Sequence, residues 1–165
     1  VPGIEAGTGS LGHGFSIGFG IALSAIIRDL NYKVYVIVGD GELNEGSIWE
    51  AALFAQHHKL DNLTVIIDRN KFQSIYSTED TLNLEPFADK WKSFNWNVVN
   101  VDGHDHQNLL DAFNFVVKDK PKCIVADTVK GKGVSFMENN ILWHYRSPQD
   151  EEYDAALAEL EKNNA

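Results

Sequence analysis

The sequence predicts an α/β fold in which helices cover both faces of a parallel sheet. Short apolar runs rich in β-branched residues alternate along the chain with segments whose apolar residues recur every three or four positions. The first of these runs, residues 34–38, is continuous and apolar, as expected of a strand that is buried on both faces of a parallel sheet. The connections between such strands are expected to be right-handed crossovers.

The N-terminal third is predicted to contain a loop, a helix and a strand. Residues 1–10 are rich in glycine and form the loop. Apolar residues at helical spacing predict a helix over residues 11–29, and the glycines within it permit tight packing against another backbone. Asn31 breaks this pattern before the strand at 34–38.

The rest of the chain continues the alternation. Pro86 suits the first turn of a short helix because its φ angle is already helical. The helix over 106–118 is expected to place Leu109, Leu110, Phe113 and Val117 on one face. The expected elements are helices over 46–59, 87–94, 106–118 and from about 149, strands over 63–67, 96–101 and 122–128, and an irregular polar stretch over 72–85.

Length, charge and cysteine content narrow the class of protein. The 165 residues fit one domain with a real core, and the abrupt start without methionine suggests that an N-terminal portion is missing. A net charge of -10 argues against a nucleic-acid binder. Cys123 is the single cysteine, which is compatible with a reducing cytoplasm. No segment is long enough to predict a membrane span.

Two glycine motifs match known signatures without their structural context. Residues 7–12 fit the dinucleotide pattern G-x-G-x-x-G, but no strand precedes them, as that site requires. Residues 14–18 fit the hydrolase pattern G-x-S-x-G, but Ser16 lies within a predicted helix, which favours core packing. A calcium loop at Asp40 is rejected because Glu45 stands where an EF-hand needs glycine.

The histidine pairs are assigned structural roles. His57 and His58 are adjacent on a helix and cannot bind one metal from the same face. His104 and His106 flank Asp105 at a strand end, where Asp105 is expected to cap the helix that follows.

The best candidate for chemistry is the turn after the first strand. Asp40 stands there between two glycines, and Asn70 follows the next strand of the predicted sheet. Ligands of parallel sheets gather at the carboxyl ends of the strands, so both side chains should face one crevice. Their oxygens suit Mg²⁺ or Ca²⁺, with a phosphate completing the coordination. Both residue types are also common in turns, and that alternative stays open.

Several motifs together resemble the transketolase family. Gly39-Asp40-Gly41 followed by Asn70 is similar to the signature of enzymes that use thiamine diphosphate. Further similarity to transketolase covers nearly the whole chain, and it is closest to the N-terminal subunit of the split form. The segments that carry it are Gly9–Gly14, Gly41–Gly46, Asp127–Gly133 and Trp143-His144.

The resemblance implies a set of cofactor ligands. Mg²⁺ (or Ca²⁺) would be held by Asp40, by the Asn70 side chain and by the backbone carbonyl of Phe72. This cation would bind the diphosphate of thiamine diphosphate, whose oxygens would also meet the backbone of Gly41. The loop of Gly9, Ser10 and Leu11 would contact the aminopyrimidine.

The resemblance also implies two residues near the chemistry. His144 would reach the cofactor beside the reacting centre, where a histidine can move protons near neutral pH. Glu45 would belong to a carboxylate network between subunits, although an acid at a helix N-terminus is favourable for electrostatic reasons alone. Tyr145 stands where the family commonly has glycine, which leaves donor and acceptor preference open.

The activity implied is transfer of a two-carbon ketol unit between ketose and aldose sugars, commonly phosphorylated. The chain would be the diphosphate-binding domain over residues 1–165, without the pyrimidine-binding domain that completes the site. That domain, or a C-terminal transketolase subunit, would be its partner in a dimer or heterotetramer. The alternatives are a thiamine diphosphate enzyme acting on a 2-oxo acid and a non-catalytic subunit that retains the fold.

Overall fold

Four parallel strands form the central sheet, as the sequence predicts. The structure, a computed structural model, describes residues 2–74 and 76–163. The strands lie in the order β1-β2-β6-β5, and every neighbouring pair is parallel. Their bounds are Val34–Gly39 for β1, Leu63–Arg69 for β2, Asn97–Asp102 for β5 and Lys122–Asp127 for β6.

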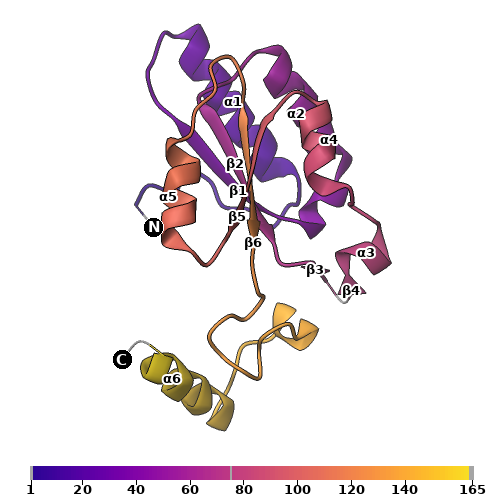
Figure 1. Cartoon of the computed structure of the whole chain (residues 1–165), viewed down its shortest axis with the longest axis vertical. Coiled ribbons are helices and arrows are strands. Elements are labelled where there is room, and N and C mark those ends of the chain that lie inside the picture. The colour runs from indigo at the N-terminus through magenta and orange to yellow at the C-terminus, as the bar shows by residue number, and fades with distance from the viewer. Residues whose placement is uncertain (1, 75, 164–165) are drawn as a thin grey trace.

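Helices cover both faces of this sheet (Figure 1). Helices α1, α2 and α4 pack against one face, and α5 packs against the other. The crossovers between parallel strands place α2, α4 and α5 there, and α1 precedes β1 in the chain. The helices are α1 (His13–Ile27), α2 (Gly46–His57), α3 (Thr78–Thr81), α4 (Phe87–Ser93), α5 (His106–Asn114) and α6 (Glu151–Asn163), with 3₁₀ turns η1 (Gly41–Asn44) and η2 (Ile141–His144).

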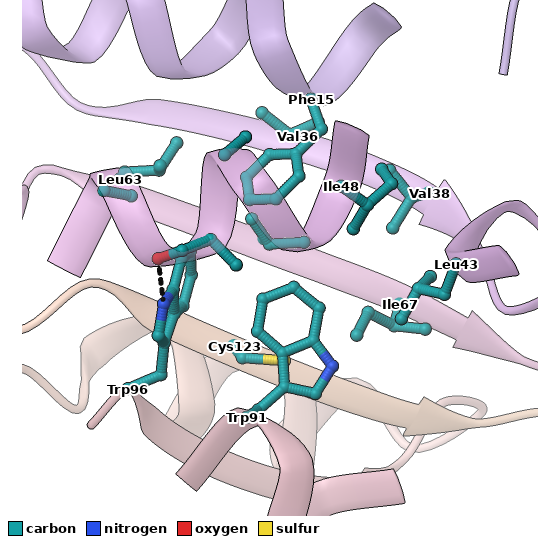
Figure 2. Packing of buried hydrophobic residues seen from close by; sticks show 14 of the residues in the cluster. Phe15, Val36, Val38, Leu43, Ile48, Leu63, Ile67, Trp91, Trp96 and Cys123 are labelled. Atoms are coloured by element: carbon teal, nitrogen blue, oxygen red, sulfur yellow. Dashed lines mark hydrogen bonds between the residues drawn. The ribbon is translucent and has the colours of Figure 1, made fainter. Parts of the chain in front are cut away.

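Aromatic side chains pack against one another in the larger core, between the sheet and helices α1, α2 and α4 (Figure 2). The Trp91 ring lies 6.2 Å from that of Phe15 and 4.9 Å from that of Trp96, with centroids as reference points. The Trp96 Nε1–H donates to the Ala52 carbonyl at 2.9 Å, so this buried ring keeps a hydrogen bond. Cys123, on β6, lies in the same core with no exposed surface.

Gly18 permits the close approach of α1 to the edge strand β1. A Cβ atom at this position would lie 2.3 Å from Cγ2 of Val36, far inside van der Waals contact. The predicted tight packing is therefore present at Gly18, but the neighbour is a side chain rather than another backbone, and a Cβ atom at Gly20 would meet nothing within 4 Å.

The second core is smaller and leaves part of its face open. Helix α5 packs on β5 and β6 through Leu109 and Phe113. Helix α5 does not cover this face of the sheet as far as β1, where Ile37 is 76% exposed. Lys122 is buried at the edge of this core, and its ammonium group donates to the carbonyls of Ala112 and Phe113 at 2.8 Å. This contact satisfies carbonyl groups at the C-terminal end of α5.

The expectation of irregular structure over 72–85 is wrong in part. Strands β3 (Phe72–Gln73) and β4 (Tyr76–Ser77) form a short antiparallel pair, and α3 follows at once. The Ser77 hydroxyl caps α3 by accepting the Asp80 N–H at 3.1 Å. Elements of two to four residues are too short to produce a periodic pattern, which is why the sequence did not indicate them.

The helix predicted over 106–118 ends earlier, at Asn114. Phe115 is already extended, and the β-branched pair Val116-Val117 that follows favours this change. Val117 therefore lies outside the helix, and Leu110 is 54% exposed rather than on the buried face. The other predicted helices and strands agree with the structure to within about two residues, including the end of β2, which continues to Arg69.

The chain after β6 leads away from the carboxyl ends of the strands and carries η2 and α6 (Figure 1). The loop after β6 is hydrogen-bonded to α6, where the Ser135 hydroxyl donates to the carboxylate of Glu159. The Arg146 guanidinium also lies over the Trp143 ring, 4.7 Å from its centroid. Among the residues described, no helix is both long and apolar enough to cross a membrane.

Candidate functional site

Asp40 is fixed at the end of β1 by three donors. Its carboxylate is 1% exposed. Oδ2 accepts the Lys71 N–H at 2.7 Å and the Arg69 Nη1–H at 2.9 Å. Oδ1 accepts the Gly41 N–H at 2.8 Å and, among the described residues, no other donor. Oδ1 therefore keeps a lone pair for a further ligand, while Oδ2 is fully used.

Burial and charge act on this carboxyl in opposite directions. Burial raises the pKa of Asp40 above its ordinary value, and the Arg69 guanidinium and the N–H groups of Lys71 and Gly41 oppose that rise. A carboxylate held this way is fixed in orientation before any cation arrives. It is the kind of hard oxygen ligand that Mg²⁺ accepts.

Asn70 is oriented by the neighbouring Asp68. The Asn70 Nδ2 group donates to Asp68 Oδ2 at 3.1 Å, and Thr128 donates to the other oxygen of Asp68. The Asn70 Oδ1 atom accepts the Phe72 N–H at 3.0 Å. This hydrogen-bond pattern assigns which end of the amide is oxygen. The amide oxygen retains one lone pair, again among the described residues.

Strand register brings Asp40 and Asn70 to the same edge of the sheet. Gly39 on β1 pairs with Asp68 on β2, and the Asp40 N–H donates to the Asp68 carbonyl at 3.2 Å. The predicted juxtaposition of these strand ends is therefore present. The carboxyl ends of β6 and β5 lie level with them, since Asp127 pairs with both Arg69 and Asp102.

The glycine-rich loop before α1 is tied to the Asp40 turn. The Gly12 N–H donates to Oε1 of Glu42 in η1 at 2.8 Å. Gly12 has a φ of 80°, a conformation that favours glycine. Ser10 hydrogen-bonds through its hydroxyl to His13 at 3.0 Å, and Leu11 is 51% exposed.

Gly41 provides close packing rather than a free donor. Its N–H group is engaged with Asp40, and a Cβ atom here would lie 2.3 Å from Cβ of Gln73. Gln73 in turn accepts a hydrogen bond from Asn44 at 3.0 Å. The expected contact between the Gly41 backbone and a diphosphate stays a prediction.

Glu45 and His144 lie outside this hydrogen-bonded group. Glu45 precedes α2, is exposed and makes no side-chain capping bond, so both of its predicted roles stay open. His144 ends η2, in the segment after β6. Partial burial, and after it the charge of Lys130, lowers the pKa of His144, which favours neutral imidazole at neutral pH.

The alternative motifs take structural roles. Ser16 lies within α1 and donates to the Gly12 carbonyl at 3.3 Å. His57 and His58 are exposed at the end of α2. Asp105 caps α5 as expected, accepting the N–H groups of Gln107 at 2.8 Å and Asn108 at 3.0 Å.

Sequence reasoning missed the residues that orient the two ligands. The sequence patterns assign no role to Asp68, Arg69 or Thr128. Strand alternation carried one usable signal, because residue 69 follows Val65 and Ile67 on the face that points into the larger core. An arginine there needs buried acidic partners.

The oxygen donors at this edge fit a divalent cation bridged to phosphate. Among the described residues, no three His, Cys, Asp or Glu side chains converge on a metal position. A cation held here would rely on one carboxylate, amide and carbonyl oxygens, and oxygens of its ligand. That donor set suits Mg²⁺, which commonly combines one or two carboxylates with substrate phosphates.

Comparisons with known proteins point to one family. Residues 1–161 match the family model described as transketolase, thiamine diphosphate binding domain. The chain is 44% identical over 162 residues to one subunit of the apulose-4-phosphate transketolase of Phocaeicola vulgatus, covering 97% of this chain and 58% of that protein. It is 43% identical over 165 residues to a 6-deoxy-6-sulfo-D-fructose transketolase subunit of a Clostridium species, covering 99% of this chain and 60% of that protein.

Solved structures show the same fold. The transketolase of Campylobacter jejuni superposes with a TM-score of 0.78 at 29% identity, covering 86% of this chain and 24% of that one. The chain thus spans somewhat more than half the length of these curated relatives and a smaller share of the solved structure.

Proposed function

Because the chain belongs to the transketolase family and matches its thiamine diphosphate-binding domain, we propose that it is the diphosphate-binding part of a ketol transferase. The enzyme would move a two-carbon unit from a ketose to an aldose, with sugar phosphates as the preferred substrates. One observation carries the proposal: Asp40 Oδ1 and Asn70 Oδ1 each keep a lone pair at the same sheet edge.

Mg²⁺ and thiamine diphosphate are the proposed cofactors. Asp40, Asn70 and the Phe72 carbonyl would hold the cation, and Ca²⁺ could occupy the same oxygen ligands. When bound, thiamine diphosphate supplies the carbon nucleophile and the electron sink for breaking and forming the carbon–carbon bond. The chain itself contributes binding, orientation and charge.

The loop before α1 is proposed to hold the aminopyrimidine. Leu11 offers apolar surface, and Gly9 and Ser10 offer backbone groups in an exposed loop. The hydrogen bond from Gly12 to Glu42 fixes this loop relative to the turn that holds the metal ligand. Both halves of the cofactor would therefore be positioned by elements that are already connected.

His144 is proposed to handle protons at the reacting centre. Its lowered pKa keeps the imidazole neutral near pH 7, so it can accept a proton from a sugar hydroxyl. Glu45 is proposed to take part in a carboxylate network with a neighbouring subunit, which its exposure permits.

A pyrimidine-binding partner is proposed to complete the site. Relatives whose names describe them as transketolase subunits support a separate partner chain. Large apolar side chains on the outer surfaces of α1 and α2 would be covered in such an assembly, among them Ile17 (44% exposed) and Phe54 (47%). A dimer or heterotetramer in the cytoplasm, to which residues 1–165 contribute one diphosphate-binding domain, is the proposed form.

A 2-oxo acid substrate is the second candidate. Tyr145 is 73% exposed beside His144, with the two ring centroids 4.8 Å apart. A bulky side chain beside the proposed catalytic histidine can alter which donor reaches the cofactor. A screen of ketose phosphates against pyruvate, measured by consumption of each donor, separates the two activities.

The cofactor assignment is tested by calorimetry on the native-length chain assembled with its partner. Thiamine diphosphate should bind saturably in the presence of Mg²⁺ and lose most of its affinity in Asp40→Asn and Asn70→Ala. Ser16→Ala, whose hydroxyl only bonds within α1, is the control and should bind normally. Unchanged binding in both ligand variants would show that the metal site has been misplaced, and absent binding by the native assembly would favour a non-catalytic subunit.

A further inference from the structure

The buried side chain of Arg69 contacts three acidic side chains. The residue is 3% exposed. Its Nη1 is 2.9 Å from Oδ2 of Asp40, and its Nη2 is 3.1 Å from Glu79 and 2.9 Å from Glu85. Nη1 also donates to the Thr78 hydroxyl at 2.8 Å. Three carboxylates thus surround a single guanidinium.

These contacts fix the guanidinium in one orientation. Each Nη atom carries two hydrogens, and the four contacts use all of them. The plane also lies against the Phe87 ring, with the guanidinium carbon 5.0 Å from the ring centroid. Arg69 therefore has little freedom to move relative to Asp40.

The anchors of Arg69 come from a separate part of the chain. Thr78 and Glu79 belong to α3, and Glu85 and Phe87 lie at the start of α4. Glu85 is itself held, since it accepts the Phe87 N–H at 2.7 Å through its other oxygen. Asp40 is thereby linked through Arg69 to residues 78–87, which lie beyond the β3–β4 pair.

We propose that Arg69 is a positioning residue that makes Asp40 a ligand through one oxygen only and so sets the choice of cation. This proposal rests on the proposed function, because it takes Asp40 as the metal ligand. The Arg69 and Lys71 donors occupy Oδ2, and Oδ1 is left to the cation. A carboxylate without Arg69 could turn and bind a cation through both oxygens.

One-oxygen binding favours Mg²⁺ over Ca²⁺. Mg²⁺ requires nearly ideal octahedral geometry at about 2.0–2.1 Å, whereas Ca²⁺ accepts six to eight oxygens and carboxylates bound through both oxygens. Loss of the Arg69 contact should therefore weaken Mg²⁺ binding more than Ca²⁺ binding. A change in the ratio of the two affinities reports on ligand geometry, because a general loss of stability would leave that ratio unchanged.

The surrounding carboxylates keep the arginine compatible with a nearby cation. A lone guanidinium beside a divalent ion would repel it, but Glu79 and Glu85 supply compensating negative charge. Glu85 does not need to contact the ion for this effect. Its removal should weaken cation binding through Arg69, even though its side chain is 54% exposed.

The test measures cation affinity directly in the assembled protein with thiamine diphosphate present. Mg²⁺ and Ca²⁺ titrations are followed by calorimetry, and Mn²⁺ is followed by electron paramagnetic resonance. Arg69→Met should weaken Mg²⁺ binding by about 10- to 100-fold, the usual range for residues that orient metal ligands, with a smaller loss for Ca²⁺. Arg69→Lys keeps the charge but cannot make all four guanidinium contacts, so its Mg²⁺ affinity should lie between those of Arg69→Met and the native protein.

Two further variants keep the proposal falsifiable if Arg69→Met does not fold. Glu85→Gln preserves the shape and should lower Mg²⁺ affinity several-fold, and combining it with Arg69→Lys should give less than the product of the two single losses. Lys92→Met is the matched control, because it removes an exposed ion pair with Asp89 on α4, and its cation affinities should equal those of the native protein.

The two proposals fail in different ways. Absence of Mg²⁺-dependent cofactor binding in the native assembly would defeat the proposed function. Normal binding in the native assembly, with a Mg²⁺ to Ca²⁺ affinity ratio within twofold of native in Arg69→Lys and a Mg²⁺ affinity equal to native in Glu85→Gln, would overturn the role of Arg69.

Discussion

Two glycines in α1 should respond oppositely to the same substitution. A Cβ atom at Gly18 would lie 2.3 Å from Cγ2 of Val36, whereas at Gly20 it would meet nothing within 4 Å. Both positions are in the interior of one helix, so alanine brings the same gain in helix propensity, about 0.8–1.0 kcal/mol.

The difference between the two sites comes from the clash. Carbon atoms pack best at about 3.5–4.0 Å, so the new methyl at residue 18 would overlap Val36 by more than an ångström. Overpacking of a well-filled core costs about 1–3 kcal/mol. Gly18→Ala should therefore range from nearly neutral to destabilising by about 2 kcal/mol, since the propensity gain offsets part of that cost. Gly20→Ala should stabilise the fold by about 0.5–1 kcal/mol.

Urea unfolding followed by tryptophan fluorescence measures both effects, because the buried tryptophans lie in the core that α1 covers. The double variant Gly18→Ala with Val36→Ala removes the overlapping methyl groups and should show a favourable coupling energy. If Gly18→Ala and Gly20→Ala raise the unfolding midpoint equally, the close approach of α1 to β1 is not as the structure has it.

Two smaller predictions concern α5. Hydrogen bonds from the Asn108 and Gln107 N–H groups lower the pKa of Asp105, so its contribution to stability is present above the ordinary carboxyl pKa and is lost as the pH falls through the lowered value. Asp105→Asn should therefore flatten the dependence of the unfolding free energy on pH between about pH 5 and pH 2. An unchanged pH dependence in this variant would argue against the cap. Leu109→Ala should destabilise the protein measurably, whereas Leu110→Ala, at a 54% exposed position, should change its stability by less than about 0.5 kcal/mol. Equal losses of thermal stability in the two variants would instead support the buried helix face that the sequence predicts.

The sheet and the placement of the two metal-ligand candidates were predictable because they depend on simple rules. The β-branched runs around Val36 and Val65 specify buried strands, and parallel strands end at a common edge. Asp40 and Asn70 each follow such a strand, so their proximity follows from strand order alone. Naming the cofactor required more than these rules, since oxygen ligands by themselves fit many phosphate compounds.

The ion pairs and hydrogen bonds that hold these ligands in place could not be predicted from the same rules. Arg69 meets Glu79 and Glu85, ten and sixteen residues further along the chain, only because α3 and α4 fold back against the end of β2. No periodic pattern marks that return, and α3 is too short to produce one. Similarly, the hydrogen bond between Gly12 and Glu42 depends on the path of a loop and not on a repeating arrangement.

The single thiol of the chain has a consequence for observing its motions. Burial raises the pKa of the Cys123 thiol well above its ordinary value, and the side chain has no exposed surface on the central strand β6. The thiolate is the nucleophile that attacks a thiol reagent, so Cys123 can react only in molecules in which the middle of the sheet has opened. The rate of modification therefore counts those rare openings in otherwise native protein, without any engineered label. Comparing that rate with and without cofactor would show whether binding at the strand ends changes how often the interior of the sheet opens.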